Sequence, residues 1–362
     1  MTRRIRVALA LAAFPALLAG LVACSPAAAP QRDCGSSGCR TPVSCGASKS
    51  PQAPTTPVAV RTEPVARLLE QAVPGEELAL PAGVFTFSDF RPVPEEQRLG
   101  VDVPSRVSGI IGAGTRATAF RMVPRSSTAA GAVPTEFPQS NRLSLMRVTG
   151  PSPRLSGFSL LGSEQGHPYN GLLVERTTGA RITDLCVAGV PGTDHQPPGE
   201  TFGIADYRTV GSVYRRIQVD GRHVGAAGFG ANVSRNLTVI DSRFFDNRYS
   251  AGATFWEVDG ITLRNVASVG NGLIGLNFER VGGQVHLVHC VTRGNGDGDL
   301  RITSDFSSAQ YTIEDPVTAD GHLTVVLPPT YLGRPNLQRR ADVRVLVHGV
   351  DRTADVVRFV GG

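Results

Sequence analysis

The sequence predicts an all-β chain that winds into a coil of short parallel strands, because one motif recurs at a nearly constant spacing. The copies of this motif start at Gly171, Gly203, Gly228, Gly252, Gly275 and Asp299. These starts are 32, 25, 24, 23 and 24 residues apart. A second series ends at Asp184, Arg216, Asp241, Asn265 and His289, with steps of 32, 25, 24 and 24. Two series with matching steps indicate a solenoid, in which each unit stacks on its neighbour.

Each unit has the signals of strands and turns. The segments are rich in Val, Ile, Leu and Phe, and Gly, Asn or Asp bounds them. About 24 residues fit three short strands and three turns, stacked about 4.8 Å from the next unit. Asp184, Asp241 and Asn265 then fall at one turn, where short polar side chains tolerate left-handed backbone, so we expect a structural stacking role for them.

The first 62 residues have the composition of a leader and a tether. Residues 1–23 join an arginine-rich start to an apolar run, as in a secretory signal peptide. The end of this run, Leu21-Val22-Ala23-Cys24, resembles the lipobox of bacterial lipoproteins. The resemblance implies an exported protein that is lipid-anchored through Cys24 to the outer face of the bacterial cell membrane. The alternative is a plain secretory signal with a chance cysteine.

Residues 24–62 are rich in Pro, Ala, Ser and Thr, which predicts a flexible tether. The tether contains Cys34, Cys39 and Cys45, and an oxidising exterior allows one disulfide with a thiol left over. Which of the three would pair is left open by their spacing.

The charge balance argues against a nucleic-acid partner. The chain has 36 Lys and Arg against 31 Asp and Glu, a net charge of +5. Three arginines lie in residues 1–23, which leaves 33 against 31, or +2, for the remainder. We expect no nucleic acid and a monomer.

The ends of the repeat carry a resemblance to a known fold. Residues 64–72 have helical spacing and would cover the open end of a solenoid. The strand "LPAGVFTF" and the turn "GIIGAGT" follow within residues 77–115. Together with the repeat, these segments resemble right-handed parallel β-helix proteins of the pectate-lyase-like superfamily. The resemblance implies a right-handed parallel β-helix over 63–316 with an N-terminal capping helix, and we expect a C-terminal β cap over 317–362.

Alternation within the first series predicts which side chains face outward. One outward column reads Leu173, Ala205, Gly230, Thr254, Asn277 and Arg301. The other reads Glu175, Tyr207, Asn232, Trp256, Glu279 and Thr303. Aromatic rings beside amides and carboxylates suit a sugar chain, so we expect a glycan-binding groove that uses Tyr207, Asn232, Trp256, Asn277 and Glu175. The alternative is an ordinary polar sheet face.

The sequence leaves catalysis open. Glu175 and Glu279 are four strands apart, about 19 Å, which is too far for the carboxylate pair of a glycosidase. The superfamily resemblance implies a lyase-type site with Arg301 as base and Glu279, Asp299 and Asp297 as acidic or calcium-binding groups, with Ca2+ as the cofactor. A plain turn and a cross-strand ion pair explain the same residues.

A second candidate site is the longest turn, residues 192–200. It supplies Asp194, His195 and Glu200, and its Asp-His pair resembles epimerase-type sites. Our leading hypothesis is therefore a protein that binds an extracellular polysaccharide and, if it is an enzyme, cleaves or epimerises it. The alternative is a non-catalytic surface scaffold, because the superfamily includes proteins of both kinds.

Three residues pose questions about the interior. Alternation points Asp206 inward, so it needs a partner or a bulge in its strand. Cys186 and Cys290 lie about four rungs apart, too distant for a disulfide with each other, and we expect two buried free thiols.

Overall fold

The computed structural model describes residues 60–61, 65–87, 91–93, 97–122, 144–162, 170–190, 201–222, 227–305 and 309–361. They belong to one unit, residues 41–362, while residues 1–40 form a second unit outside the described part. The expected signal peptide, the anchor at Cys24, and Cys34, Cys39 and Cys45 of the tether all lie outside the described residues. No helix within the described ranges is long and apolar enough to span a membrane.

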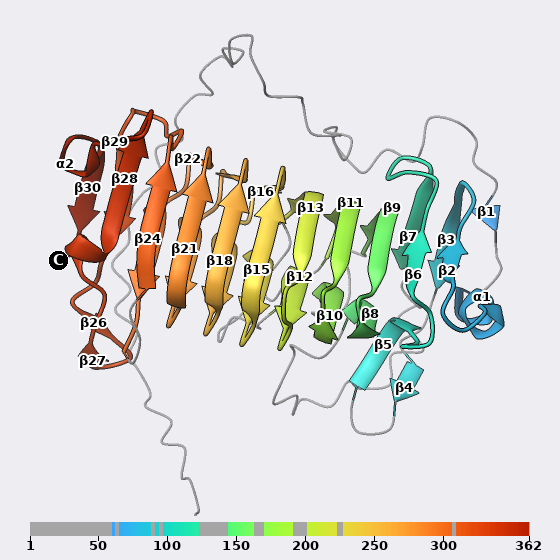
Figure 1. Cartoon of the computed structure of the whole chain (residues 1–362). Helices are drawn as coiled ribbons and strands as arrows, with labels where there is room; N and C mark the ends of the chain where they lie inside the picture. The colour runs from blue at the N-terminus through green and yellow to red at the C-terminus, as the bar shows by residue number, and fades with distance from the viewer. Residues whose placement is uncertain are drawn as a thin grey trace, which may run out of the picture. The chain divides into compact units, whose positions relative to one another are not determined.

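The described chain is a right-handed parallel β-helix, as predicted (Figure 1). One wall, which we call sheet 1, runs parallel from β5 to β30, and β4 adds an antiparallel edge. Its members are β4 (Arg91–Val93), β5 (Gln97–Val103), β8 (Ser144–Pro151), β10 (Asn170–Thr178), β12 (Phe202–Tyr207), β14 (Ala227–Asn232), β17 (Ala251–Trp256), β20 (Ile274–Glu279), β23 (Gly298–Thr303), β25 (Leu323–Val326) and β30 (Val357–Val360).

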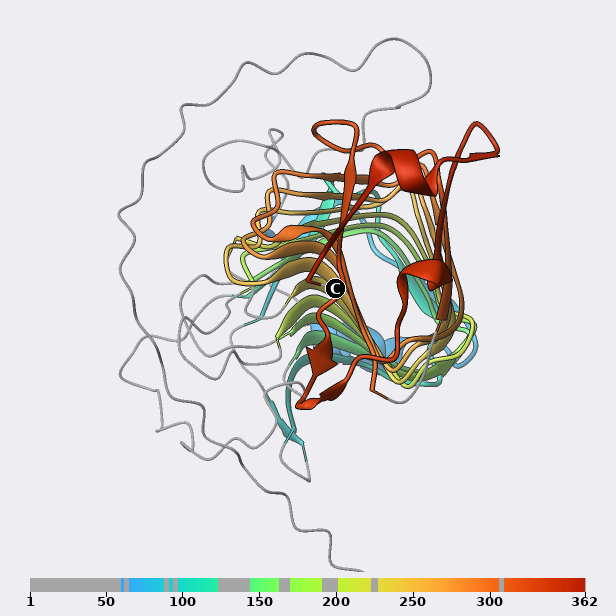
Figure 2. The same ribbon diagram turned by 90° about the vertical axis from the view of Figure 1, so that its left-hand side faces the viewer.

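The remaining walls form one continuous bent sheet around the interior (Figure 2). Its members in the first half are β1 (Val60–Arg61), β2 (Glu77–Ala79), β3 (Gly83–Phe87), β6 (Gly109–Ile111), β7 (Thr118–Met122), β9 (Arg154–Leu161), β11 (Arg181–Ala188) and β13 (Val213–Asp220). Those in the second half are β15 (Arg235–Ile240), β16 (Arg243–Phe245), β18 (Asp259–Arg264), β19 (Ala267–Val269), β21 (Gly282–Val288), β22 (Val291–Arg293), β24 (Ala309–Glu314), β28 (Val343–Val347) and β29 (Val350–Asp351). In the middle rungs the chain therefore passes through three strands per turn of the coil, which is the predicted unit.

Stacked apolar side chains fill the interior. The rings of Phe255 and Phe278 stack with centroids 5.1 Å apart, and Phe229 continues the row at 6.0 Å from Phe255. These three side chains are fully buried. Phe229 aligns with Ala253, and Phe255 with Ala231, so large and small apolar side chains alternate between rungs at the inward positions and burial of apolar surface is continuous along the coil.

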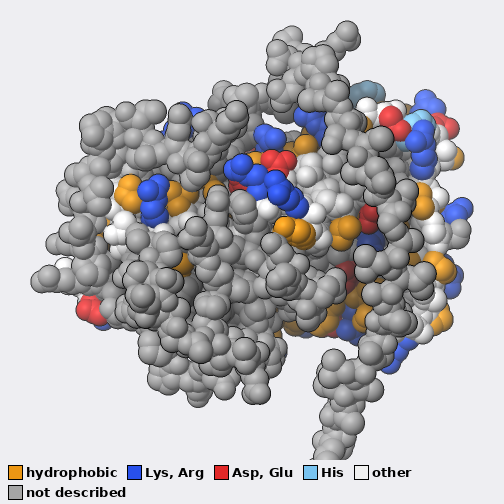
Figure 3. Space-filling model, turned by 180° about the vertical axis from the view of Figure 1, so that it is seen from behind, with side chains coloured by type: hydrophobic (Ala, Val, Ile, Leu, Met, Phe, Trp, Pro, Cys, Tyr) orange, Lys and Arg blue, Asp and Glu red, His pale blue; other side chains and the backbone are white. Residues whose placement is uncertain are grey.

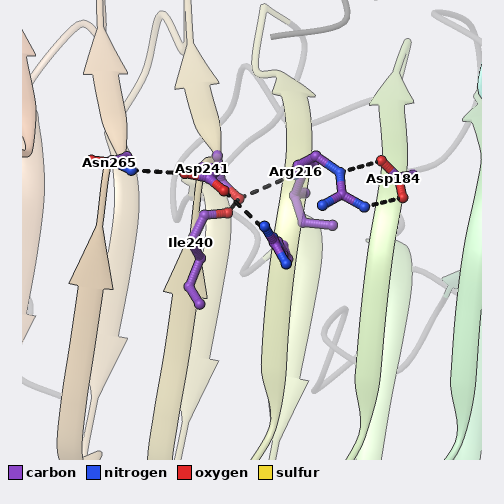
Figure 4. Close-up of polar contacts among 8 residues, drawn as sticks. Asp184, Arg216, Ile240, Asp241 and Asn265 are labelled. Carbon is purple, nitrogen blue, oxygen red and sulfur yellow. Dashed lines mark hydrogen bonds and ion pairs between the residues drawn. The ribbon is translucent and has the colours of Figure 1, made fainter. Parts of the chain in front are cut away.

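A left-handed residue recurs at the same point of the bent sheet in five successive rungs, within β11 and β13 in the first two and between two short strands in the next three, as predicted for Asp184, Asp241 and Asn265. Asp184, Arg216, Asp241, Asn265 and His289 have φ between 50° and 54°. Their side chains bond between rungs (Figure 4): Arg216 donates to both carboxylate oxygens of Asp184 at 2.5 and 2.6 Å, and Asn265 Nδ2 donates to Asp241 Oδ1 at 2.8 Å. These contacts stack one turn on the next.

Both ends of the coil are covered. Helix α1 (Val65–Gln71) confirms the predicted N-terminal helix, and its Leu69 is buried in the core. At the other end, within residues 317–362 where we expect a C-terminal β cap, β25, β28 and β30 extend the parallel ladders. The C-terminal region also contains the hairpin β26 (Thr330–Tyr331) and β27 (Arg334–Pro335), a 3-10 turn (Arg340–Asp342) and α2 (Thr353–Val356).

Asp206 points inward and has partners, which resolves the question that the sequence posed. It is fully buried, and it accepts hydrogen bonds of 2.6 Å from the hydroxyls of Thr209, Tyr214 and Ser234. Burial raises its pKa, and these hydrogen bonds offset part of that rise.

The two cysteines of the coil differ from each other. Cys290 is a buried free thiol, as predicted, and burial raises its pKa to about 12. Cys186 is disulfide-bonded, so the prediction of a free thiol there is wrong. The four-rung separation excludes a disulfide only between Cys186 and Cys290, and because Cys290 is free, the partner of Cys186 lies outside the described residues.

Candidate glycan-binding face

The two predicted outward columns exist in register on sheet 1. We call the first the Trp256 column, in which Glu175, Tyr207, Asn232, Trp256, Glu279 and Thr303 pair in succession across adjacent strands. The second, the Arg301 column, pairs Leu173, Ala205, Gly230, Thr254, Asn277 and Arg301 in the same way. Residues more than 120 positions apart in the sequence therefore share one strip. The view from behind in Figure 3 shows arginine and acidic side chains beside hydrophobic ones.

The N-terminal end of the strip is a charged cluster. Glu175 is 7% exposed and forms an ion pair with Arg147, Nη2 to Oε2, at 2.8 Å. Arg147 lies opposite Leu173 on one side and Asp102 on the other. Burial raises the pKa of Asp102; Arg147 works against this rise and Glu175 adds to it. The sequence reasoning missed Arg147 and Asp102, because β5 and β8 precede the regular repeat.

The middle of the strip presents aromatic side chains. Tyr207 and Trp256 are half-buried, with Arg208 over the Tyr207 ring at 4.9 Å and Arg280 over the Trp256 ring at 5.8 Å. Phe202 is a further half-buried aromatic that the sequence reasoning did not name. A Cβ atom at Gly230 would collide with the Phe202 ring, so the glycine of the Arg301 column lets this ring lie against the outward face.

Glu279 forms the C-terminal end of the accessible strip. Its two carboxylate oxygens accept hydrogen bonds from Asn277 Nδ2 and from the Tyr331 hydroxyl, each at 2.6 Å. Tyr331 also hydrogen-bonds the Trp256 side chain. Burial and the adjacent Glu279 raise the pKa of Tyr331, so its hydroxyl stays protonated at neutral pH. The sequence reasoning missed Tyr331, which lies outside the repeat and 52 residues beyond Glu279.

Several oxygens of the strip lack a protein partner. Within the described part of the chain, Asn232 Oδ1, Asn277 Oδ1 and Thr303 Oγ1 are buried and accept or donate no hydrogen bond. A buried polar atom without a partner costs about 1–3 kcal/mol, so three on one face need a compensating interaction. Sugar hydroxyls are donors that match the two amide oxygens.

Arg301 has no side-chain partner among the residues that the structure describes. It is half-buried, lies opposite Asn277, and makes no ion pair or hydrogen bond in the described ranges. Glu279 faces the same way on the adjacent strand, but the two side chains form no ion pair. A guanidinium in this state is available to a carboxylate or hydroxyl of a ligand.

Asp299 and Asp297, the other two residues of the expected lyase-type site, form no ion pair or hydrogen bond with Arg301 in the described part of the chain. Asp299 is 9% exposed and accepts a hydrogen bond of 2.8 Å from the backbone N–H of Thr324, and burial raises its pKa. The equivalent residues of the neighbouring strands are Gly252 and Gly275. A Cβ atom there would meet the buried side chain of Ser268 or Thr292, so this point of each strand faces inward. Asp297 is an exposed turn residue.

The structure therefore does not assemble the expected calcium site from Glu279, Asp299 and Asp297. Among the described residues, no group of three or more His, Cys, Asp or Glu could hold a metal ion. The alternative loop residues Asp194, His195 and Glu200 lie outside the described residues.

Comparisons with known proteins give structural similarities alone. No protein-family model matches the chain, and no curated protein matches it in sequence. The A-module of a mannuronan C-5 epimerase from Azotobacter vinelandii is 11% identical, with a TM-score of 0.42 over 82% of this chain and 88% of that one. The Dettilon tailspike protein is 11% identical, with a TM-score of 0.43 over 78% of this chain and 63% of that one.

The periplasmic alginate epimerase AlgG is 12% identical, with a TM-score of 0.39 over 67% of this chain and 73% of that one. Similarities at this level carry no argument about activity. The functional conclusion depends on the side chains of sheet 1, whose register makes this chain a parallel β-helix with one continuous polar and aromatic strip.

Proposed function

We propose that the protein binds an extracellular polysaccharide along the outward face of sheet 1. The observation that carries the proposal is the unbroken register of the Trp256 column. The half-exposed members, from Tyr207 to Glu279, lie on four successive strands and span about 14 Å at about 4.8 Å per strand, which is long enough for two or three sugar units. Tyr207 and Trp256 supply faces for sugar rings, and the unsatisfied oxygens of Asn232 and Asn277 supply acceptors for hydroxyls.

The charge distribution supports an acidic polysaccharide. Arg147 and Arg280 are held by protein carboxylates, the first by Glu175 and the second by Glu257 at 2.7 Å. Arg301 has no such partner in the described ranges, so it is the cation that a sugar carboxylate would meet. A uronic-acid polymer is therefore the expected ligand class.

Export and anchoring are part of the proposal. They are supported by the leader and by Cys24, with residues 24–62 as the tether that separates the β-helix from the membrane. An exported, tethered protein with a long binding face would hold a polysaccharide at the cell surface. Labelling with a radioactive fatty acid, and its loss in Cys24→Ala, tests the anchor separately from binding.

A lyase or epimerase activity is the second candidate, favoured by one observation: Arg301, on the same face as Glu279, has no ion-pair partner among the described residues. The geometry supports it less than binding, because Glu279 already accepts two hydrogen bonds and Tyr331 keeps its proton. Ultraviolet absorbance of unsaturated products, followed over a panel of polyuronates with and without calcium, tests cleavage. Proton NMR of the recovered polymer tests epimerisation. If neither assay detects a change in the polymer, the protein binds the polysaccharide without modifying it.

The test of binding is affinity electrophoresis of the purified protein in gels that contain polyuronate or a neutral polymer. Trp256→Ala removes the central ring and should weaken binding by about 2 kcal/mol, or about 30-fold. Phe245→Ala is the matched control, because Phe245 is also half-buried, with Arg243 over its ring at 4.7 Å, but lies on β16 away from sheet 1. Equal effects of the two variants would contradict the proposed binding face. If no polymer in the gel slows the protein, the protein would be a rigid surface scaffold that binds no polysaccharide.

A further inference from the structure

The hairpin β26–β27 is a rigid element that is fixed to the end of β23. Its two central residues, Leu332 and Gly333, have φ of 50° and 75°, as a tight two-residue hairpin turn requires. Asn336 secures its base: Nδ2 donates to the carbonyls of Ile302 and Pro328 at 3.1 and 2.9 Å, and Oδ1 accepts from the N–H of Ser304 at 2.8 Å. In Figure 1 the hairpin lies below β28 and β30 at the C-terminal end of the coil.

This hairpin lies across the end of the Trp256 column. Tyr331 of β26 reaches back to Glu279 on β20 and to the Trp256 side chain. Thr303, the next member of the column after Glu279, is 1% exposed. Arg334 of β27 adds an ion pair to Asp305 at 3.4 Å, beyond the end of β23. The column is therefore half-exposed from Tyr207 to Glu279 and covered at Thr303.

A ligand cannot pass the hairpin along the neighbouring Arg301 column either, because this column is buried beside Glu279. Asn277 is 7% exposed, because its amide lies against Glu279 beneath the Tyr331 contact. A polysaccharide that runs along the strip toward the C-terminus meets Tyr331 at Glu279. A flexible loop would move aside, but Asn336 and Leu337 fix the hairpin to the end of β23 through three hydrogen bonds with Ile302 and Ser304.

We propose that the binding face is closed by Tyr331 at its C-terminal end and therefore recognises an end of a polyuronate chain instead of its interior. The inference rests on the proposed function and adds the part of the ligand that is bound. The terminal sugar would lie beside Trp256 and Glu279, where the Glu279 carboxylate would accept the extra hydroxyl that only a chain end carries, and Arg301, which pairs with Asn277 on the adjacent strand and is half-buried, would meet the sugar's carboxylate.

The test is the binding stoichiometry on size-fractionated polygalacturonate of short, medium and long average length, measured by isothermal titration calorimetry. Recognition of an end predicts the same number of protein molecules per chain for all three fractions. Recognition of the interior predicts a number that rises in proportion to chain length, and that result would overturn the inference while the proposed function stands. Absence of binding to every fraction would overturn the proposed function, and the inference with it.

Two variants separate the barrier from the hydrogen bond. Tyr331→Phe keeps the ring and loses the contact with Glu279, so it should keep the stoichiometry of one end per protein. Tyr331→Gly removes the barrier and should give a stoichiometry that grows with chain length. A Tyr331→Gly protein that shows native circular dichroism and still counts chain ends would contradict the barrier.

Discussion

The buried carboxylate of Asp206 gives a prediction whose size follows from its contacts. Asp206 is fully buried, and one of its oxygens, Oδ2, accepts the hydroxyl of Tyr214 at 2.6 Å. Tyr214→Phe removes this donor without changing the ring. A buried acceptor that loses its donor costs about 1–3 kcal/mol, so we expect the free energy of unfolding to fall by that amount.

The assay is equilibrium unfolding in urea, followed by far-ultraviolet circular dichroism, with the midpoint and slope compared between variants. Tyr311→Phe is the matched control, because Tyr311 is 2% exposed and its hydroxyl forms no hydrogen bond within the described part of the chain. The control should change stability by less than about 0.5 kcal/mol. Equal losses in the two variants would show that the Asp206 network does not stabilise the fold and would refute the reasoning.

The remaining predictions concern pH, packing and charge. Because burial raises the folded-state pKa of Asp206, the native state binds more protons than the unfolded state above about pH 3.9, so this group's contribution to stability is lost as pH rises toward its folded pKa. Asp206→Asn should remove that part of the pH dependence in urea titrations, and an unchanged slope would count against it. Gly252→Ala places a Cβ atom against Ser268 and should cost about 1–3 kcal/mol, whereas Gly282→Ala, whose nearest atom would be at 3.4 Å, should cost little by the same titration. Arg301→Gln should weaken polyuronate binding and lessen its salt dependence in calorimetry, and an unaltered affinity would exclude Arg301 from the site.

The register of the binding face could be predicted from the sequence because residues one repeat apart along a solenoid lie next to each other on adjacent strands. Once Gly203, Gly228, Gly252 and Gly275 mark equivalent points, alternation fixes the side chains that follow. Tyr207, Asn232 and Trp256 therefore lie side by side as predicted. The turn at Asp241 and Asn265 follows for the same reason, since short polar side chains tolerate its left-handed backbone.

The structure differs from the sequence-based predictions at positions where the alternation of a strand breaks down or where the repeat ends. Asp299 lies at the start of its strand, where the chain comes out of a turn and two successive side chains face inward, so a period of two misplaces it. Tyr331 belongs to a hairpin after the repeat, and no spacing links it to Glu279. Arg147 and Asp102 precede the regular period, although alternation along β8 would have placed Arg147 outward.

The chain has a single tryptophan, and it lies at the centre of the proposed face. Intrinsic tryptophan fluorescence during a titration with polygalacturonate therefore reports on this face and on no other. We predict a saturable change in intensity or emission maximum that disappears when the polymer is digested to single sugars. Tight binding measured by calorimetry without any change in the emission of Trp256 would place the ligand elsewhere and contradict the account.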